Sequence, residues 1–175
     1  MTPDSGPPLE EDVGVARAAA GVVQRLLERQ GHIRMENTGE RALTPEDIGV
    51  AATHRIMNTR ILEALGPLGG RVRVDTPERW QGLERKVMVV VHPLSGVVSP
   101  SAFDLSTGRL CVMASRHEVG LVLVSRDHLG ETLEDYLPVA DQAVGWPDEA
   151  GCGHAQNLAV WQWLRENGRV SGMEG

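Results

Sequence analysis

Apolar residues in the first third of the chain recur at helical spacing, then form a short unbroken run, then return to helical spacing. Residues three and four positions apart share one face of a helix, whereas a short unbroken run is typical of a buried strand. The expected elements are therefore a helix from Val15 to about Leu27 that stops at Gly31, a polar loop over 31–46 with a cap or turn at Thr44-Pro45-Glu46, a strand at 48–52, and a helix that Thr53 caps and Gly66-Pro67 ends.

The rest of the chain repeats this alternation. The run at 87–91 contains no polar position, which is typical of a strand covered on both faces. The expected elements are a strand at 72–74, a loop or single helical turn at 76–82, the strand at 87–91, a loop at 92–104, a helix at about 106–117, a strand at 121–124, and a helix at about 154–167 with Leu158, Trp161 and Leu164 on one face. Strands that alternate with helices predict an α/β domain with a mostly parallel sheet and right-handed crossovers.

The 175 residues correspond to about one domain. Acidic residues and prolines fill 1–12, which are expected to form a disordered leader. Residues 13–130 are expected to form the α/β domain and 131–175 a C-terminal helical extension. No apolar run approaches the roughly 18 residues that span a bilayer, and the N-terminus is neither a signal peptide nor a transit peptide. The protein is therefore expected to be cytoplasmic, with no membrane partner.

The charged residues exclude one class of enzyme. The net charge of -7 argues against a surface coated with basic groups, although a local groove lined by arginines remains compatible with it. Of the 17 basic residues only Lys86 is a lysine, and no glycine-rich turn precedes it. A phosphate-binding P-loop needs such a turn ending in Gly-Lys-Ser/Thr. The chain therefore cannot be a self-sufficient P-loop NTPase.

Cysteine chemistry is equally restricted. Cys111 and Cys152 are too few for a disulfide framework. Cys152 and His154 offer two ligands where a structural zinc ion needs four, so no metal site is expected. No Ser/His/Asp or Cys/His arrangement has the local context of a nucleophilic site, which leaves a freestanding small-molecule enzyme with little support.

Polar side chains follow the expected strands, and ligands of open α/β sheets bind beyond the carboxyl ends of the strands. These side chains are Thr53, His54 and Arg55, then Asp75, Thr76, Arg79, Gln81, Gly82 and Glu84, and then Ser115, Arg116, His117 and Glu118. We expect them to converge on one rim, where guanidinium groups would suit a polyphosphate. Solvated loops are the alternative, because most α/β domains carry polar residues there.

Three segments resemble motifs of superfamily-one helicases, in the order in which that family has them. Residues 74–87, VDTPERWQGLERKV, look like motif V, which reads V-D-T, an aromatic residue, Q-G-x-E and an apolar strand. Residues 109–116, RLCVMASR, are similar to motif VI, usually R-L-N-V-A-L-T-R. Residues 48–55, IGVAATHR, resemble motif IV, an I-G-V strand followed by T-P-Y-R. The resemblance covers about residues 15–128 and implies a RecA-like three-layer fold, the second motor domain of an ATP-driven translocase on DNA or RNA.

The resemblance also implies a nucleotide site. Arg116 sits where the family has the arginine that reaches the γ-phosphate of ATP across the cleft between two motor domains. Arg55 matches a second arginine that approaches the phosphates. Gln81, Gly82 and Glu84 match the ATP-binding part of motif V, with Glu84 facing the nucleotide and its ribose.

The family implies partners as well. ATP and Mg²⁺ would be bound mainly by an N-terminal P-loop motor domain, in the same longer protein or in a separate chain. Thr76 matches a hydroxyl that touches the backbone of single-stranded nucleic acid, with DNA expected ahead of RNA.

Several positions depart from the family pattern. Cys111 replaces an asparagine, His54 replaces a tyrosine, and Glu118 replaces a second arginine, where its carboxylate could pair with Arg116. These departures favour the alternative, a degenerate helicase-like module with a binding or scaffolding role.

The tryptophans are expected to pack rather than to bind ligands. Trp80, in the aromatic position of motif V, is expected to lie in the core, with base stacking as the alternative. Trp146, Trp161 and Trp163 are expected to dock the last helix on this domain or on a partner domain.

Overall fold

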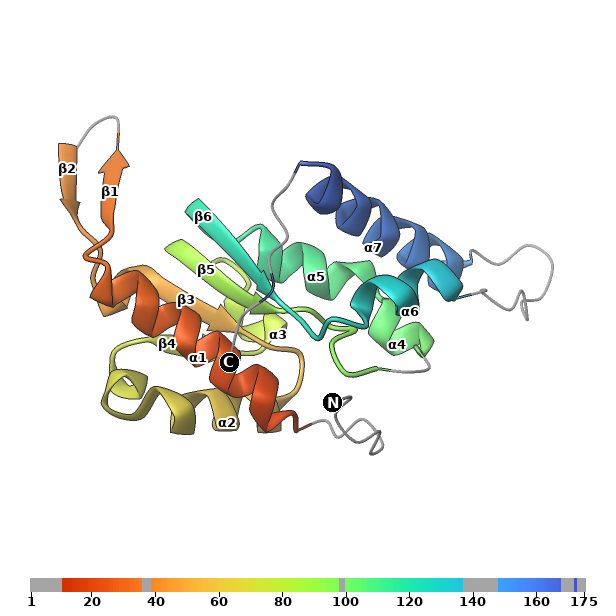
Figure 1. The fold of residues 1–175 in the computed structure, drawn as a ribbon, viewed down its shortest axis with the longest axis horizontal. Helices are drawn as coiled ribbons and strands as arrows, with labels where there is room; N and C mark the ends of the chain where they lie inside the picture. The colour runs from red at the N-terminus through yellow and green to blue at the C-terminus, as the bar shows by residue number, and fades with distance from the viewer. Residues whose placement is uncertain (1–10, 36–38, 98–99, 137–147, 168–171, 173–175) are drawn as a thin grey trace.

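A four-stranded parallel sheet lies between two layers of helices in the computed structural model of the chain (Figure 1). The structure describes residues 11–35, 39–97, 100–136, 148–167 and residue 172. The strands of the sheet are β3 (Ile48–Ala51), β4 (Arg73–Asp75), β5 (Arg85–Val91) and β6 (His117–Val124), in the order β4-β3-β5-β6. The helices are α1 (Val13–Glu28), α2 (Arg55–Leu65), α3 (Pro77–Trp80), α4 (Ala102–Leu105), α5 (Thr107–Ala114), α6 (Leu129–Asp135) and α7 (Glu149–Glu166), with short 3₁₀ helices η1 (Pro45–Asp47) and η2 (Gly66–Gly70).

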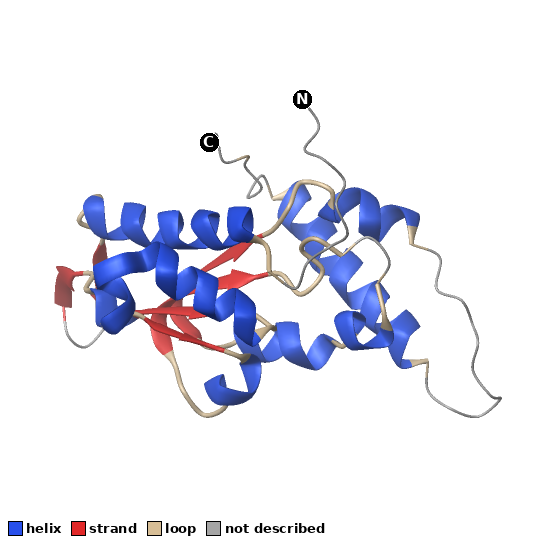
Figure 2. Ribbon diagram, turned by 90° about the horizontal axis from the view of Figure 1, so that it is seen from below, coloured by secondary structure: helices blue, strands red, loops and turns tan. Residues whose placement is uncertain are grey.

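The sheet reverses its direction of winding at β3. The chain passes from β3 to β4 on one side, and then crosses to β5 and β6 on the other side. Right-handed crossovers in opposite directions place helices on opposite faces, so α1 and α2 cover one face and α3 and α5 the other (Figure 2). The predicted parallel α/β architecture is confirmed, with a switch point between β3 and β5.

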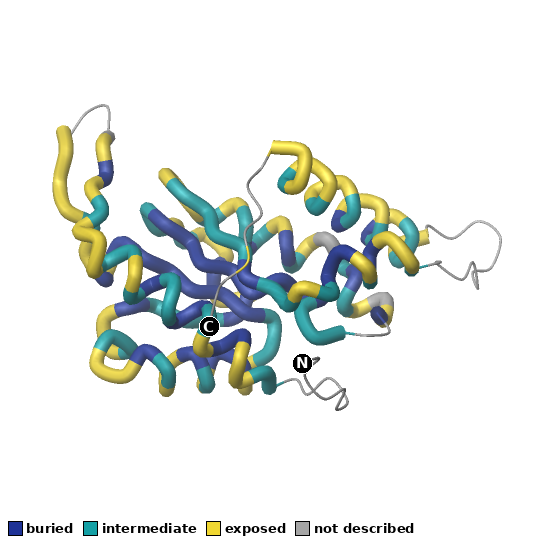
Figure 3. Tube along the Cα trace, in the orientation of Figure 1, coloured by how far each residue is buried: buried dark blue, intermediate teal, exposed yellow. Residues whose placement is uncertain are grey.

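Alternate side chains of the strands fill two separate cores, which is why the apolar run at 87–91 has no polar position. Strand β5 is accordingly buried along most of its length (Figure 3). Val50 and Val89 pack with α1 and α2, whereas Met88 and Val90 pack with α5 on the opposite face. The predicted helix near Val15 and the predicted strands after it are confirmed. They could be predicted because a helix buried along one stripe and a strand buried on both faces each produce a recognisable order of apolar residues.

Trp80 anchors the second core. Its side chain is 0% exposed, and its indole Nε1 donates a hydrogen bond to the carbonyl oxygen of Val50 at 3.3 Å. Gly49 makes this position possible, because a Cβ atom there would lie 2.5 Å from Cη2 of Trp80 and 2.6 Å from Sδ of Met88. Trp80 is therefore a core residue, as expected, and offers no exposed ring to a nucleic-acid base.

The prediction of a loop over 31–46 is wrong. The segment forms an antiparallel hairpin of β1 (His32–Met35) and β2 (Gly39–Ala42), followed by η1 (Figure 1). Two hydrogen bonds of 2.6 Å from Arg41 to Asp47 hold its base, and those bonds keep the pKa of the Asp47 carboxyl well below its usual range. Residues of β2 are all exposed, so no alternation of apolar and polar residues marked the strand.

Several element boundaries also differ from the predictions. The N-cap of α2 is His54 rather than Thr53, and α5 ends at Ala114, so that β6 already begins at His117. Helix α4 lies in the predicted loop at 92–104, and α7 begins at Glu149. Arg116 consequently lies between a helix and a strand rather than on the helix.

The last helices form a third cluster at one end of the sheet, in which α6 and α7 pack against α4. Trp161 contributes to this cluster and lies so close to Gly130 that a Cβ atom there would be 2.8 Å from its ring. Docking of the last helix through Trp161 is confirmed, whereas Trp146 and most of the expected leader lie outside the described residues. Asp12, which the sequence placed in that leader, caps α1 by accepting a hydrogen bond from Val15 N at 3.0 Å.

Candidate functional site

The structure divides the expected site residues between the two edges of the sheet. Glu84 directly precedes β5 and Arg116 directly precedes β6, and these parallel strands are neighbours. The backbone N–H of Arg85 donates to the carbonyl oxygen of Arg116 at 2.9 Å. Glu84 and Arg116 therefore lie together at the amino edge of the sheet, where the strands begin.

Arg55 and Thr76 lie at the opposite edge. Arg55 begins α2 a few residues after β3, and Thr76 follows the last residue of β4. Since β3 and β4 run parallel with Ala51 opposite Asp75, both residues lie at the carboxyl edge of the sheet. The expectation that all these groups converge on one rim is wrong, because α5 runs back along the sheet and delivers Arg116 to the strand starts.

Gln81 and Gly82 lie on the segment between the two edges. Both are exposed, and Gly82 has a φ of 74°, a conformation that favours glycine. The segment leads from α3 to the start of β5, while Trp80 beside it is buried under the sheet. Its exposed residues thus approach the amino edge, on the side of Glu84.

The guanidinium of Arg116 is half-buried and is held by uncharged groups. Its Nε donates to the carbonyl oxygen of Val112 at 3.1 Å, and its Nη2 donates to the hydroxyl of Ser115 at 2.9 Å. Glu118 instead forms an ion pair with Lys86. In the described parts of the chain, Arg116 has no carboxylate partner, so the pairing with Glu118 that the sequence suggested is not made.

Charges at the carboxyl edge surround Glu78. A hydrogen bond from its own backbone N–H, another from the Thr76 hydroxyl, and the charges of Arg109 and Arg55 lower the pKa of Glu78. Nε of Arg109 lies 3.7 Å from the Glu78 carboxylate. Thr76 itself is only 8% exposed, and its hydroxyl already bonds to Glu78. A ligand could therefore reach that hydroxyl only by displacing the Glu78 carboxylate.

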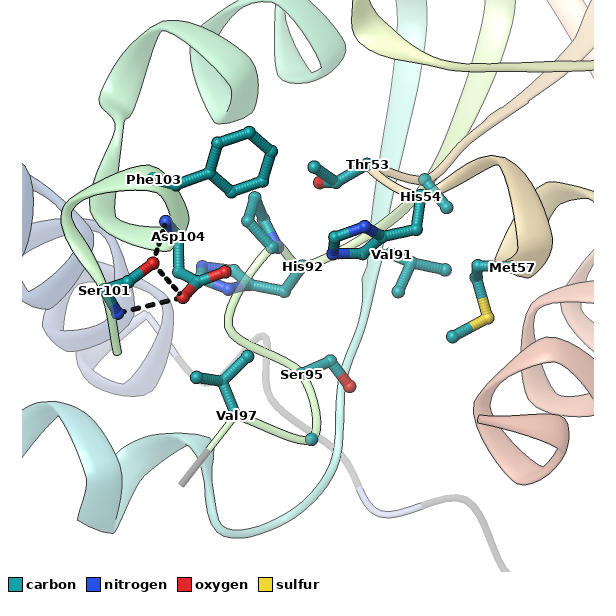
Figure 4. Close-up of a pocket in the computed structure, with 13 residues that line it drawn as sticks. Thr53, His54, Met57, Val91, His92, Ser95, Val97, Ser101, Phe103 and Asp104 are labelled. Atoms are coloured by element: carbon teal, nitrogen blue, oxygen red, sulfur yellow. Dashed lines mark hydrogen bonds between the residues drawn. The ribbon is translucent and has the colours of Figure 1, made fainter. Parts of the chain in front are cut away.

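A cavity of about 520 Å³ opens at the same edge, beyond the ends of β3 and β5. Figure 4 shows side chains from the start of α2, from the loop after β5 and from α4 facing one another around it. The polar and aromatic residues that line it are Thr53, His54, His92, Ser95, Ser101, Phe103 and Asp104. It lies at the switch point between β3 and β5, the place where open α/β sheets bind ligands.

Sequence reasoning missed most of this cavity. The run at 87–91 was recognised as a strand, and His92 follows it directly, so the rule that polar residues after strands face ligands would have found His92. Phe103 could not be found in this way, because α4 brings it to the edge from outside the sheet. Phe103 lies 6.1 Å from the ring of His54, and the guanidinium of Arg109 lies over its ring at 3.6 Å.

His92 is the most buried titratable group of the cavity, with 5% of its surface exposed. Its Nδ1 accepts a hydrogen bond from the backbone N–H of Leu94 at 3.2 Å, which leaves the proton of the neutral ring on Nε2. Burial lowers the pKa of His92 to about 4. The imidazole is therefore neutral at pH 7 and can donate one hydrogen bond.

Acid should destabilise the fold through this residue. The unfolded chain binds a proton at the His92 position near pH 6.5, whereas the folded chain binds it only near pH 4, so stability is complete above about 6.5 and falls as the pH drops toward 4. We expect His92→Gln to remove about 2 kcal/mol of the loss in unfolding free energy between pH 7 and pH 5, measured by urea denaturation. His32→Gln, at an exposed position, is the control. An unchanged pH dependence in His92→Gln would show that this histidine does not titrate with folding.

The described residues offer no further candidate for a metal or catalytic site. They contain no group of three His, Cys, Asp or Glu side chains that could hold a metal ion. Nε2 of His154 contacts the carbonyl oxygen of Leu133 at 2.7 Å, and Cys152 is exposed. Within the same residues, no helix is both long enough and apolar enough to cross a bilayer.

The chain matches no protein-family model and no curated protein sequence.

Proposed function

We propose that this chain is the second motor domain of a superfamily-one, helicase-like ATPase with a RecA-like fold. It would work in the cytoplasm with a P-loop domain that belongs to the same longer protein or to a separate chain. The parallel three-layer architecture and the order of the three motif-like segments along the chain support the proposal.

One observation carries the proposal. Glu84 and Arg116 are separated by 31 positions that include the whole of β5, and the pairing of β5 with β6 brings them to the same edge. The proposed nucleotide site uses a carboxylate for the ribose and a guanidinium for the γ-phosphate, and the pairing of β5 with β6 brings one group of each kind to the same edge. A guanidinium facing the transferred phosphoryl group stabilises the charge that develops on it.

The proposed roles divide between the two edges. At the amino edge, Arg116 would contact the γ-phosphate, and Gln81, Gly82 and Glu84 would contact the rest of the ATP. Mg²⁺ would be held by the P-loop domain, since the described residues offer no suitable cluster of ligands. At the carboxyl edge, Thr76 would contact the backbone of single-stranded nucleic acid, DNA ahead of RNA. Arg55 lies on that side, which moves its proposed contact from ATP to a nucleic-acid phosphate.

A second candidate function is a degenerate helicase-like module with a binding or scaffolding role. The low exposure of Thr76 and the acidic net charge of -7 favour it, because both weaken contact with nucleic acid. In that case the amino edge would still bind a partner, but no ATP would be hydrolysed between them.

The proposal is tested by identifying what faces the amino edge. A benzophenone amino acid placed at position 84 should crosslink to a polypeptide that contains a Gly-Lys-Ser/Thr loop, and the same group at exposed Glu131 on α6 should not. ATP hydrolysis should require both parts and should rise with single-stranded DNA. Crosslinking to a protein without a P-loop would favour the degenerate module. Robust hydrolysis by the 175 residues alone, lost in Arg116→Ala, would contradict both readings.

A further inference from the structure

The pairing of β5 with β6 is irregular where both strands begin, close to Arg116 in the chain. Arg85 lies opposite His117, but Val87 already lies opposite Gly120, so one residue of β5 faces two residues of β6. Such a bulge re-aims the side chains beside it. Here the β5 residue is Lys86, and its ammonium forms an ion pair with the carboxylate of Glu118.

This ion pair is protected from water more than most surface pairs. The Lys86 side chain is 19% exposed and that of Glu118 is 35% exposed. Lys86 is the only lysine of the sequence. Its contact with Glu118 joins the starts of both strands at the edge that carries Glu84 and Arg116.

Glu118 would otherwise have Arg116 as a neighbouring cation. Arg116 lies in the turn before β6 and Glu118 lies in β6, two positions later, so their Cα atoms are at most about 7 Å apart and the two long side chains can reach one another. Among the residues that the structure describes, the Arg116 guanidinium bonds to the Val112 carbonyl and the Ser115 hydroxyl, and neither carries a charge. A carboxylate released from Lys86 would therefore be attracted to a guanidinium that has no competing anion among the described residues.

We propose that Lys86 is a positioning residue that holds the Glu118 carboxylate away from Arg116 and so keeps the Arg116 guanidinium available to a phosphate group. The consequence for ATP rests on the proposed function, whereas the choice of partner by Glu118 does not. Glu118 departs from the family pattern. In this proposal Lys86 neutralises its charge, so Glu118 does not form an ion pair with Arg116.

The first test measures how accessible the Arg116 guanidinium is in the purified chain. Phenylglyoxal, which modifies unpaired arginines, is followed at each position by peptide mass spectrometry, with exposed Arg55 as the internal reference. Lys86→Met, which keeps the aliphatic stem, should slow modification of Arg116 by about two- to five-fold, the range that a partly exposed ion pair supports. Lys86→Arg should leave the rate unchanged, and Lys86→Met/Glu118→Gln should restore it.

A purely structural role for Lys86 gives a different pattern. Looser pairing of β5 and β6 would speed modification of Arg116 in Lys86→Met, and Glu118→Gln would not reverse the change. Either result overturns the proposal. Glu118→Gln alone keeps the proposal falsifiable should Lys86→Met fail to fold. Several-fold faster modification of Arg116 in Glu118→Gln would mean that Glu118 already pairs with Arg116 and would overturn the proposal. An unchanged rate of modification supports the ion pair of Glu118 with Lys86.

The second test uses the chain together with its P-loop domain. Lys86→Met should lower ATP turnover in proportion to the loss of Arg116 reactivity, and Lys86→Met/Glu118→Gln should recover it. Turnover that depends on Arg116 but not on Lys86 would overturn this inference and leave the proposed function standing. The expected phenylglyoxal pattern without any ATP hydrolysis would support the inference about Glu118 and contradict the proposed function.

Discussion

Arg116→Lys is expected to slow ATP turnover by roughly 10³-fold in the chain joined to the proposed P-loop domain, while the KM for ATP changes little. Lysine keeps the positive charge but loses the planar fork that contacts two phosphate oxygens at once. In the proposed function the guanidinium acts on charge that develops during phosphoryl transfer, so its loss should appear in kcat. Steady-state hydrolysis with saturating single-stranded DNA measures both constants.

Arg165→Lys is the matched control for this substitution. Arg165 lies on α7 and forms an ion pair at 2.5 Å with Glu134 of α6, the helix that follows the end of β6, so turnover of the Arg165→Lys variant should equal that of the unchanged protein. DNA affinity should survive in Arg116→Lys, since it is spread over many backbone contacts. Equal turnover in both variants would contradict a role for Arg116 at the γ-phosphate.

Trp80→Ala is expected to lower the free energy of unfolding by about 3–5 kcal/mol, the usual cost of removing a large aromatic side chain from a core. The substitution empties the space between α5 and the sheet and leaves the Val50 carbonyl without its hydrogen bond from Nε1. Urea denaturation followed by far-ultraviolet circular dichroism measures the change without depending on tryptophan fluorescence.

Trp163→Ala provides a comparison with the same change in side chain. Trp163 is 53% exposed on α7, so its removal should cost much less than that of Trp80. A loss in Trp80→Ala as small as that expected for Trp163→Ala would mean that burial of Trp80 under β3 contributes little to stability.

The order of layers could be predicted from the sequence because burial leaves a local signature. A strand covered on both faces needs apolar residues at every position, as at 87–91, and a helix packed on one side needs them at every third or fourth position, as near Val15. The hairpin of β1 and β2 escaped prediction for the same reason. Every described residue of β2 is exposed, and Ile33 of β1 is buried, so the hairpin shows no sustained pattern of apolar residues and is defined by its backbone pairing.

The candidate site, too, could be predicted from the sequence only in part. The residues proposed to contact ATP, Arg116 for the γ-phosphate and Glu84 for the ribose, could be named from their motif-like segments, but their edge could not, because it depends on the direction in which α5 returns along the sheet. The cavity lined by His92 and Phe103 likewise exists only because α4 packs beyond the ends of β3 and β5.

The sequence by itself determined the alternation of helices and strands, the burial of Trp80 and the lack of a P-loop, since each depends on residue type and local spacing. Only the tertiary structure decided which edge each polar side chain reaches and that Glu118 pairs with Lys86 rather than Arg116. Those outcomes depend on strand order and register between segments distant in the chain, and the spacing of residues within one segment carries no information about either.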